Sequence, residues 1–297
     1  MTKRASQGPQ STSENFDVPG SSQEQDNGSS QGTTGSETKS GPFICYGARA
    51  TRSNRKPGSK RPTQYRVGGT KRITVAQAIH LKSAVRFAEL IHLPLNAHVT
   101  IHWSLTDVND DPNGELFAKI RDGVARWLRR RGIPLTGIWV REKRSGGQAE
   151  AEHAHFIFHL PVNWLDGAKL IDKSGGVEGC AELLQLEAAL HRILAQYAGR
   201  PDDYAVKLKL PTDGGLPGPC NGRSYDGLYA LKGGGPKVWK LFPRIRKEWR
   251  RPQGLIFGKR CGTTQNLGPA ERRQNPAAYD YELELIERAR RLRKEVA

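Results

Sequence analysis

Apolar side chains recur at two different spacings along this chain, and these spacings predict an alternation of helices and strands. After Thr74, whose hydroxyl suits a helix N-cap, apolar residues follow at helical spacing to about Leu90. The segment 97–105 is instead rich in β-branched and aromatic residues and is closed by Asp, Asn and Pro, which is typical of a buried strand. The same reasoning predicts helices over 74–90, 115–131, 179–198, 223–232 and 277–296, and strands over 97–105, 135–143, 153–160 and 204–210.

Two of these strands flank a short polar turn and therefore predict a β-hairpin. The turn contains Ser145-Gly146-Gly147, and Pro161 ends the second strand. From residue 97 onward the elements follow in the order βαββαβα, a pattern that folds as α+β. We therefore expect a central antiparallel sheet flanked by helices.

Composition divides the chain into four parts. Residues 1–40 are Ser, Gln, Gly, Thr and Glu with hardly an aliphatic side chain, so they bury too little surface to order and predict a disordered tail. Residues 41–72 carry nine basic residues and no acidic one, which predicts a flexible arm that is either a phosphate contact or a solvated linker. The folded domain is expected over 73–240, and a basic extension with an amphipathic helix over 241–297.

Charge narrows the class of partner. The chain has 47 Lys and Arg against 30 Asp and Glu, a net charge of +17, which points to a polyanion: nucleic acid first, an acidic membrane surface second. No apolar run is long enough to span a membrane and the first thirty residues lack an apolar signal, so we expect a cytoplasmic protein without a membrane span. The scattered cysteines Cys45, Cys180, Cys220 and Cys261 are expected to be reduced and mostly structural.

Histidines alternate with apolar residues in the strand 153–160. Because successive side chains of a strand point to opposite faces, His153 and His155 share one face, and the hairpin brings Glu142 of the partner strand near them. Two imidazoles and a carboxylate could hold one Mg²⁺ or Mn²⁺ ion and leave positions open for substrate oxygens. His159, about 13 Å further along the strand, is a weaker ligand. The alternative is that these histidines are ordinary, partly buried strand residues.

A second cluster of reactive side chains lies downstream, in Ser224–Gly233. On the predicted helix, Tyr225 and Tyr229 are four residues apart and Lys232 follows three residues later, so all three share one face. A phenol is a poor nucleophile at neutral pH, but a metal-polarised phosphate and a nearby cation would lower the barrier to its attack. The alternative is that the tyrosines cap the core and Lys232 is a cation at the helix C-terminus.

Basic and aromatic side chains alternate again beyond residue 240. Such a segment suits single-stranded nucleic acid, which needs both charge and stacking surfaces, although an ordinary basic surface with anchoring aromatics has the same composition. The candidate DNA-binding residues are Arg244, Arg246, Lys247, Trp249, Arg250 and Arg251.

The order of these motifs resembles that of the HUH endonucleases, most closely the two-tyrosine rolling-circle replication initiators of small phages and plasmids. The resemblance covers about Ala97 to Gly233 and consists of a hydrophobic strand, then His-x-His, then Tyr-x-x-x-Tyr-x-x-Lys. It implies the ferredoxin-like or RRM-like HUH architecture, with His153 and His155 as metal ligands and Glu142 as the variable third ligand. Tyr229 would be the nucleophile and Tyr225 the second tyrosine. One departure is Leu228, where members with two tyrosines often carry a further lysine.

The resemblance also implies a reaction and its partners. A tyrosine attacks a phosphate of single-stranded DNA at a replication origin or hairpin, keeps the 5′ phosphate as a phosphotyrosine and releases a 3′ hydroxyl, and a second attack rejoins the strand. The sequence has no phosphate-binding loop of the G-x-x-x-x-G-K-[ST] type, so unwinding is expected to need a separate helicase from the host. Alternatives are an HUH transposase, a relaxase, whose tyrosine usually precedes the histidines, and a non-catalytic binder of single-stranded nucleic acid.

Overall fold

The structure analysed is a computed structural model of the whole chain. It describes residues 69–108, 110–143, 152–165, 169–170, 177–178, 181–210, 224–251 and 253–295, all of which lie within the unit Pro62–Ala297. The predicted tail 1–40, most of the predicted arm 41–72 and the hairpin turn at 145–147 lie outside the described residues.

The described elements follow the predicted order closely. The helices are α1 (Val75–Leu90), α2 (Glu115–Arg129), α3 (Val162–Leu165), α4 (Ala181–Ala198), α5 (Pro236–Leu241), α6 (Pro269–Arg273) and α7 (Pro276–Lys294). The strands are β1 (Ala97–His102), β2 (Gly137–Glu142), β3 (His153–Phe158), β4 (Lys169–Leu170), β5 (Val177–Glu178), β6 (Val206–Lys209) and β7 (Cys261–Thr263). The first helix begins as expected, because Thr74 and Gln77 form a reciprocal capping box.

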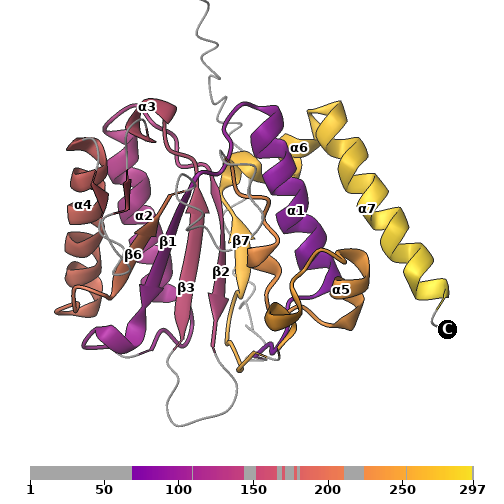
Figure 1. Cartoon of the computed structure of the whole chain (residues 1–297), viewed down its shortest axis with the longest axis horizontal. Coiled ribbons are helices and arrows are strands. Elements are labelled where there is room, and N and C mark those ends of the chain that lie inside the picture. The colour runs from indigo at the N-terminus through magenta and orange to yellow at the C-terminus, as the bar shows by residue number, and fades with distance from the viewer. Residues whose placement is uncertain are drawn as a thin grey trace, which may run out of the picture. The chain divides into compact units, whose positions relative to one another are not determined.

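The main sheet has five strands in the order β6-β1-β3-β2-β7, and each neighbouring pair is antiparallel (Figure 1). This confirms an α+β fold with an antiparallel sheet flanked by helices. The hairpin of β2 and β3 is also confirmed, and its register places Glu142 opposite His153 and Val140 opposite His155. The histidine strand is therefore the central strand of the sheet.

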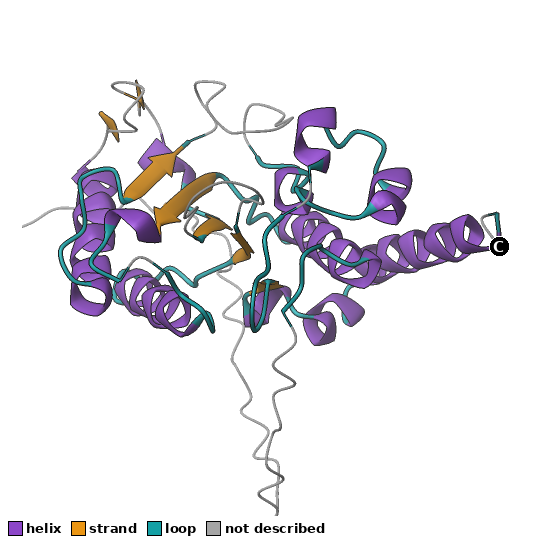
Figure 2. Ribbon diagram, turned by 90° about the horizontal axis from the view of Figure 1, so that it is seen from below, coloured by secondary structure: helices purple, strands orange, loops and turns teal. Residues whose placement is uncertain are grey.

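Helices cover both faces of the sheet, and the two faces have separate hydrophobic cores. Val99, Trp139 and Phe156 pack with α2 and α4, whereas Val140 and Ile157 pack with α1, α5 and α7. Figures 1 and 2 show these two groups of helices on opposite sides of the strands. His153 and His155 alternate with Phe156, so they lie on the face of the second core.

Two details of the main sheet differ from the sequence prediction. The predicted strand 97–105 ends at His102, because the chain then turns through a 3₁₀ helix, Trp103–Leu105, that buries the indole of Trp103. The strand β7 was not predicted, since three residues with a central glycine are too short to show an alternating pattern. It pairs with β2 and so brings part of the segment 241–297 into the sheet.

Two further expectations concern cysteines and membranes. Cys261 is a free, buried thiol in β7, and burial raises its pKa to about 11; the other three cysteines lie outside the described residues. Within the described part of the chain, no helix combines the length and the apolar character that crossing a bilayer requires.

Candidate metal and tyrosine site

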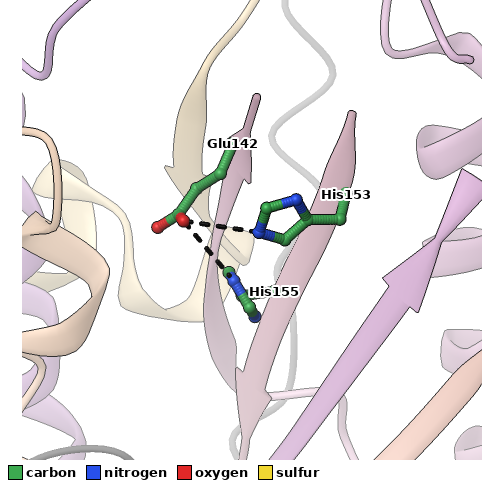
Figure 3. Close-up of side chains that lie close together, drawn as sticks. All are labelled: Glu142, His153 and His155. Carbon is green, nitrogen blue, oxygen red and sulfur yellow. Dashed lines mark ion pairs between the residues drawn. The ribbon is translucent and has the colours of Figure 1, made fainter. Parts of the chain in front are cut away.

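The predicted ligands meet on one face of the sheet. The Oε2 atom of Glu142 lies 3.4 Å from Nε2 of His153 and 3.7 Å from Nε2 of His155. Dashed lines mark these two contacts in Figure 3. Their candidate ligand atoms all lie within 4.8 Å of one another. Glu142 and His153 are cross-strand partners, and His155 is the next residue of β3 on the same face, so the hairpin register alone brings them together.

Burial sets the charges of this cluster. Glu142 is fully buried, and although burial alone would raise its pKa, contacts with His153 and His155 and the charge of Lys232 hold that pKa well below its usual value. Burial lowers the pKa of His155 to about 4, against the opposing pull of Glu142, so its imidazole is neutral at pH 7. A neutral imidazole beside an ionised carboxylate is the protonation state that a divalent ion requires.

The donor set also fits an ion chemically. It offers two imidazole nitrogens and carboxylate oxygen, and within the described residues Oε1 of Glu142 is buried without a hydrogen-bond partner. A buried acceptor of this kind is costly unless something pairs with it. Mg²⁺ or Mn²⁺ would be held by Glu142, His153 and His155. His159 is not part of the cluster, because its Nδ1 lies 2.8 Å from the carbonyl oxygen of Pro94.

Tyr229 and Lys232 reach the same cluster from a distant part of the chain. The hydroxyl of Tyr229 lies 3.3 Å from Nε2 of His155, and Nζ of Lys232 lies 2.8 Å from Oε2 of Glu142. The ammonium is also 5.4 Å from the centre of the Tyr229 ring. Burial and the negative charge of Glu142 raise the pKa of the Tyr229 hydroxyl above its usual value. The two predicted motifs therefore lie side by side, although the second one does not form the helix predicted over 223–232.

The predicted helix over 223–232 is wrong. Residues 224–228 form bends and a single bridge, and only Tyr229–Leu231 form a short 3₁₀ helix. The carboxylate of Asp226 accepts a hydrogen bond from the backbone N–H of Leu228, and Gly227 has φ +75°, in the left-handed region that a helix excludes. Tyr225 and Tyr229 therefore do not share one helix face.

Tyr225 occupies a different environment from Tyr229. Its side chain is fully buried in the second core, and burial raises its pKa well above the usual value. The ring lies 6.4 Å from that of Tyr229 and 6.1 Å from that of His98. Tyr225 is therefore a neighbour of Tyr229 and His98, but it has no surface exposed to a substrate.

Three polar residues of β1 were missed by the sequence analysis. His98, Thr100 and His102 alternate with the apolar core residues of that strand and therefore share the face of Glu142, His153 and His155. Nε2 of His98 lies 3.0 Å from Nδ1 of His155, and the His102 ring stacks on that of His153 at 5.6 Å. The sequence does contain a signal for them, because polar residues at every second position of an otherwise apolar strand indicate a polar face.

The basic segment after α5 lies next to Tyr229. Trp249 is only 8 % exposed and packs edge-on against the Tyr229 ring at 5.3 Å, which leaves little of its face for a base. Arg250 points back to the carbonyl oxygens of Pro243 and Ile245. The exposed cations of the segment are Arg244, Arg246, Lys247 and Arg251.

Comparison of the chain with protein-family models, with curated proteins and with solved structures gave no match.

Proposed function

We propose that this protein is a metal-dependent single-strand DNA endonuclease and strand transferase of the HUH type, and that it initiates rolling-circle replication. The observation that carries the proposal is the contact of 3.3 Å between the Tyr229 hydroxyl and His155, one of three grouped potential metal ligands. Tyr229 and His155 are 74 residues apart in sequence. A nucleophile, a ligand set and a cation in one place are the parts that phosphoryl transfer to a tyrosine needs.

Each residue then has a defined task. A bound divalent ion would polarise the scissile phosphate. Tyr229 attacks the phosphorus in line, its proton leaves to solvent, and a bond forms between the phenolic oxygen and phosphorus. The bond between phosphorus and the 3′ oxygen breaks, and this oxygen takes up a proton to become a 3′ hydroxyl. The DNA keeps its 5′ phosphate as an ester of Tyr229.

Lys232 offsets the charge that raises the pKa of Tyr229. In this structure the carboxylate of Glu142 disfavours the phenolate, and Lys232 lies against that carboxylate and near the phenol ring. A cation so placed stabilises negative charge on the phenolic oxygen and on the phosphate. The buried position of the site strengthens this effect, because water screens it less.

The deciding experiment traps the covalent intermediate. Purified protein is incubated with Mn²⁺ and a labelled single-stranded origin hairpin, and adducts are separated under denaturing conditions. We expect an adduct with the wild type and with Tyr225→Phe, because Tyr225 is buried, and none with Tyr229→Phe. The adduct should also disappear in excess chelator and in His153→Ala, while DNA binding persists.

Other outcomes would favour other functions. If neither the wild type nor Tyr229→Phe forms an adduct and both bind single-stranded nucleic acid equally, the protein is a non-catalytic binder of single-stranded nucleic acid. An adduct that persists in Tyr229→Phe and disappears in Tyr225→Phe would assign the nucleophile to Tyr225 instead. A transposase or relaxase would form the same adduct but prefer a transposon end or a transfer origin as its substrate.

A further inference from the structure

Two polar residues of β1 lie behind the metal cluster, and the proposed reaction gives neither of them a task. His98 and Thr100 are 1 % and 6 % exposed, on a strand whose alternate residues form the first hydrophobic core. Burying an imidazole and a hydroxyl costs free energy unless each is hydrogen-bonded. Their contacts should therefore show why these positions are polar.

Both residues are directed to a single atom. Nδ1 of His155 lies 3.0 Å from Nε2 of His98 and 3.1 Å from Oγ1 of Thr100, which is the cross-strand partner of His155. The other ring nitrogen of His98, Nδ1, has no hydrogen-bond partner among the described residues. An incompletely paired buried imidazole stabilises a fold poorly, so the arrangement is better suited to holding His155 than to holding the sheet together.

The opposite edge of the His155 ring faces the site. Its Nε2 lies 3.3 Å from the Tyr229 hydroxyl and 3.7 Å from Oε2 of Glu142. A hydrogen bond at Nδ1 fixes both the rotation of the ring and the nitrogen that carries the proton, which leaves the Nε2 lone pair free for an ion held between His155 and Glu142. Metal-binding histidines generally need such a partner on their second nitrogen.

We propose that His98 and Thr100 are positioning residues that accept a hydrogen bond from Nδ1–H of His155 and so direct its Nε2 toward a divalent ion. This inference rests on the proposed function for the identity of the site, but it concerns residues that touch neither substrate nor ion. His153 has a different neighbour, the stacked ring of His102, so the two histidines are held in different ways.

The test measures Mn²⁺ binding directly, by electron paramagnetic resonance of the free ion in a titration without DNA. Thr100→Val and His98→Leu remove the two acceptors, and each should weaken Mn²⁺ binding by about 10- to 100-fold. Thr100→Ser and His98→Gln retain a hydrogen-bonding group and should stay within about threefold of the wild type, a rescue that a purely structural role would not produce.

Thr263→Val is the matched control. Thr263 also lies on a strand, and its hydroxyl is 3.4 Å from Nε2 of a histidine, His80 in α1. His80 is not one of the three candidate metal ligands. Mn²⁺ affinity should not change in this variant. If Thr100→Val and His98→Leu bind Mn²⁺ as tightly as Thr263→Val does, the proposal is overturned.

A second measurement needs no substitution. Nitrogen-15 NMR of the histidine rings in the wild type saturated with diamagnetic Mg²⁺ should show His155 with its proton on Nδ1, and a proton on Nε2 in that state would contradict the proposal. The proposed function and the positioning role of His98 and Thr100 can also be refuted separately. A wild type that binds Mn²⁺ but forms no tyrosine adduct ends the proposed function and leaves the role of His98 and Thr100 to these measurements. A wild type that binds no Mn²⁺ ends the positioning role.

Discussion

Lys232 brings a positive charge into the buried site. It is the cation closest to the buried carboxylate of Glu142, at 2.8 Å, and it lies near the ring of Tyr229. Replacing it with methionine keeps much of the packing and removes the charge, so at saturating Mn²⁺ and DNA we expect adduct formation to slow by about 100-fold. Single-turnover kinetics with a labelled oligonucleotide measure this rate.

Lys232→Arg provides the control for charge. It keeps the cation and should restore much of the rate, while the affinity for DNA should change only a few-fold in either variant. A rate for Lys232→Met within threefold of the wild type would mean that the ammonium does not assist the attack.

At this scale the sequence predicted one half of the site well. The positions of Glu142, His153 and His155 follow from strand alternation and hairpin pairing, which are local rules that a sequence reveals. The contribution of β1 was missed, because His98 and Thr100, which are 57 and 55 residues from His155 in sequence, approach it only through the pairing of β1 with β3. The sequence of either strand alone does not predict which strand it pairs with.

At the scale of the element, the turn that carries Tyr229 depends on Gly227. Its φ of +75° is strained for any side chain, and a Cβ there would approach Cγ2 of Val85 to 2.7 Å. Gly227→Ala should therefore destabilise the fold by about 2 kcal/mol and displace Tyr229 from His155. Chemical denaturation and the rate of adduct formation measure the two effects.

Gly132→Ala is the control for backbone strain alone. Gly132 has a φ of +74°, but a Cβ there would meet nothing within 4 Å. It should cost about 1 kcal/mol and leave the rate of adduct formation unchanged. Equal effects of the two substitutions on the rate would show that Gly227 does not position the tyrosine.

The same turn explains why the helix predicted over 223–232 from residue spacing is wrong. Tyr225, Tyr229 and Lys232 have helical spacing, yet the Asp226 side chain bonds the backbone and Gly227 adopts a left-handed conformation. Local hydrogen bonding of this kind competes with a helix. Longer elements such as α1, α2 and α4 were predicted within a few residues, because their repeated apolar faces outweigh any one residue.

At the scale of the whole molecule, the net charge of +17 favours binding to a polyanion, and the exposed arginines of the segment whose Trp249 packs against Tyr229 are suited to guide a strand to it. The side chains of Arg244 and Arg246 are 73 % and 53 % exposed, and Arg251 is also exposed. Reversing all three to glutamate should weaken binding of a single-stranded oligonucleotide. The slope of log affinity against log salt should become shallower by about 2, at roughly 0.7 for each lost phosphate contact.

A charge-matched control comes from the opposite side of the sheet. Arg126, Arg129 and Arg130, in α2 and at its end, are exposed on the helix that covers the first core. Reversing these three changes the net charge equally. Fluorescence anisotropy at several salt concentrations should show a smaller loss of affinity and a slope close to that of the wild type. Equal losses in both triple variants would mean that only the net charge acts.

The buried histidines of the site also couple the stability of the molecule to pH. Burial, and then the charge of His153, lower the pKa of His102 to about 4, whereas an unfolded histidine titrates near 6.5. Between these values the unfolded chain binds the proton and the folded protein does not, so stability falls as the pH falls through this window. Burial acts oppositely on carboxyl groups and raises the pKa of Glu152 to about 7, so the total pH dependence mixes both signs.

A single substitution isolates the contribution of His102. His102→Gln cannot titrate, so the free energy of unfolding of this variant relative to the wild type should rise by about 1 kcal/mol when the pH is lowered from 7 to 5, after allowance for the partial exposure of the imidazole. Urea denaturation at both pH values, without added metal, measures the difference. The sign is diagnostic, because a histidine stabilised as a cation would make the wild type gain over the variant in acid. A difference that does not change with pH would show that the imidazole of His102 titrates alike in the folded and unfolded states.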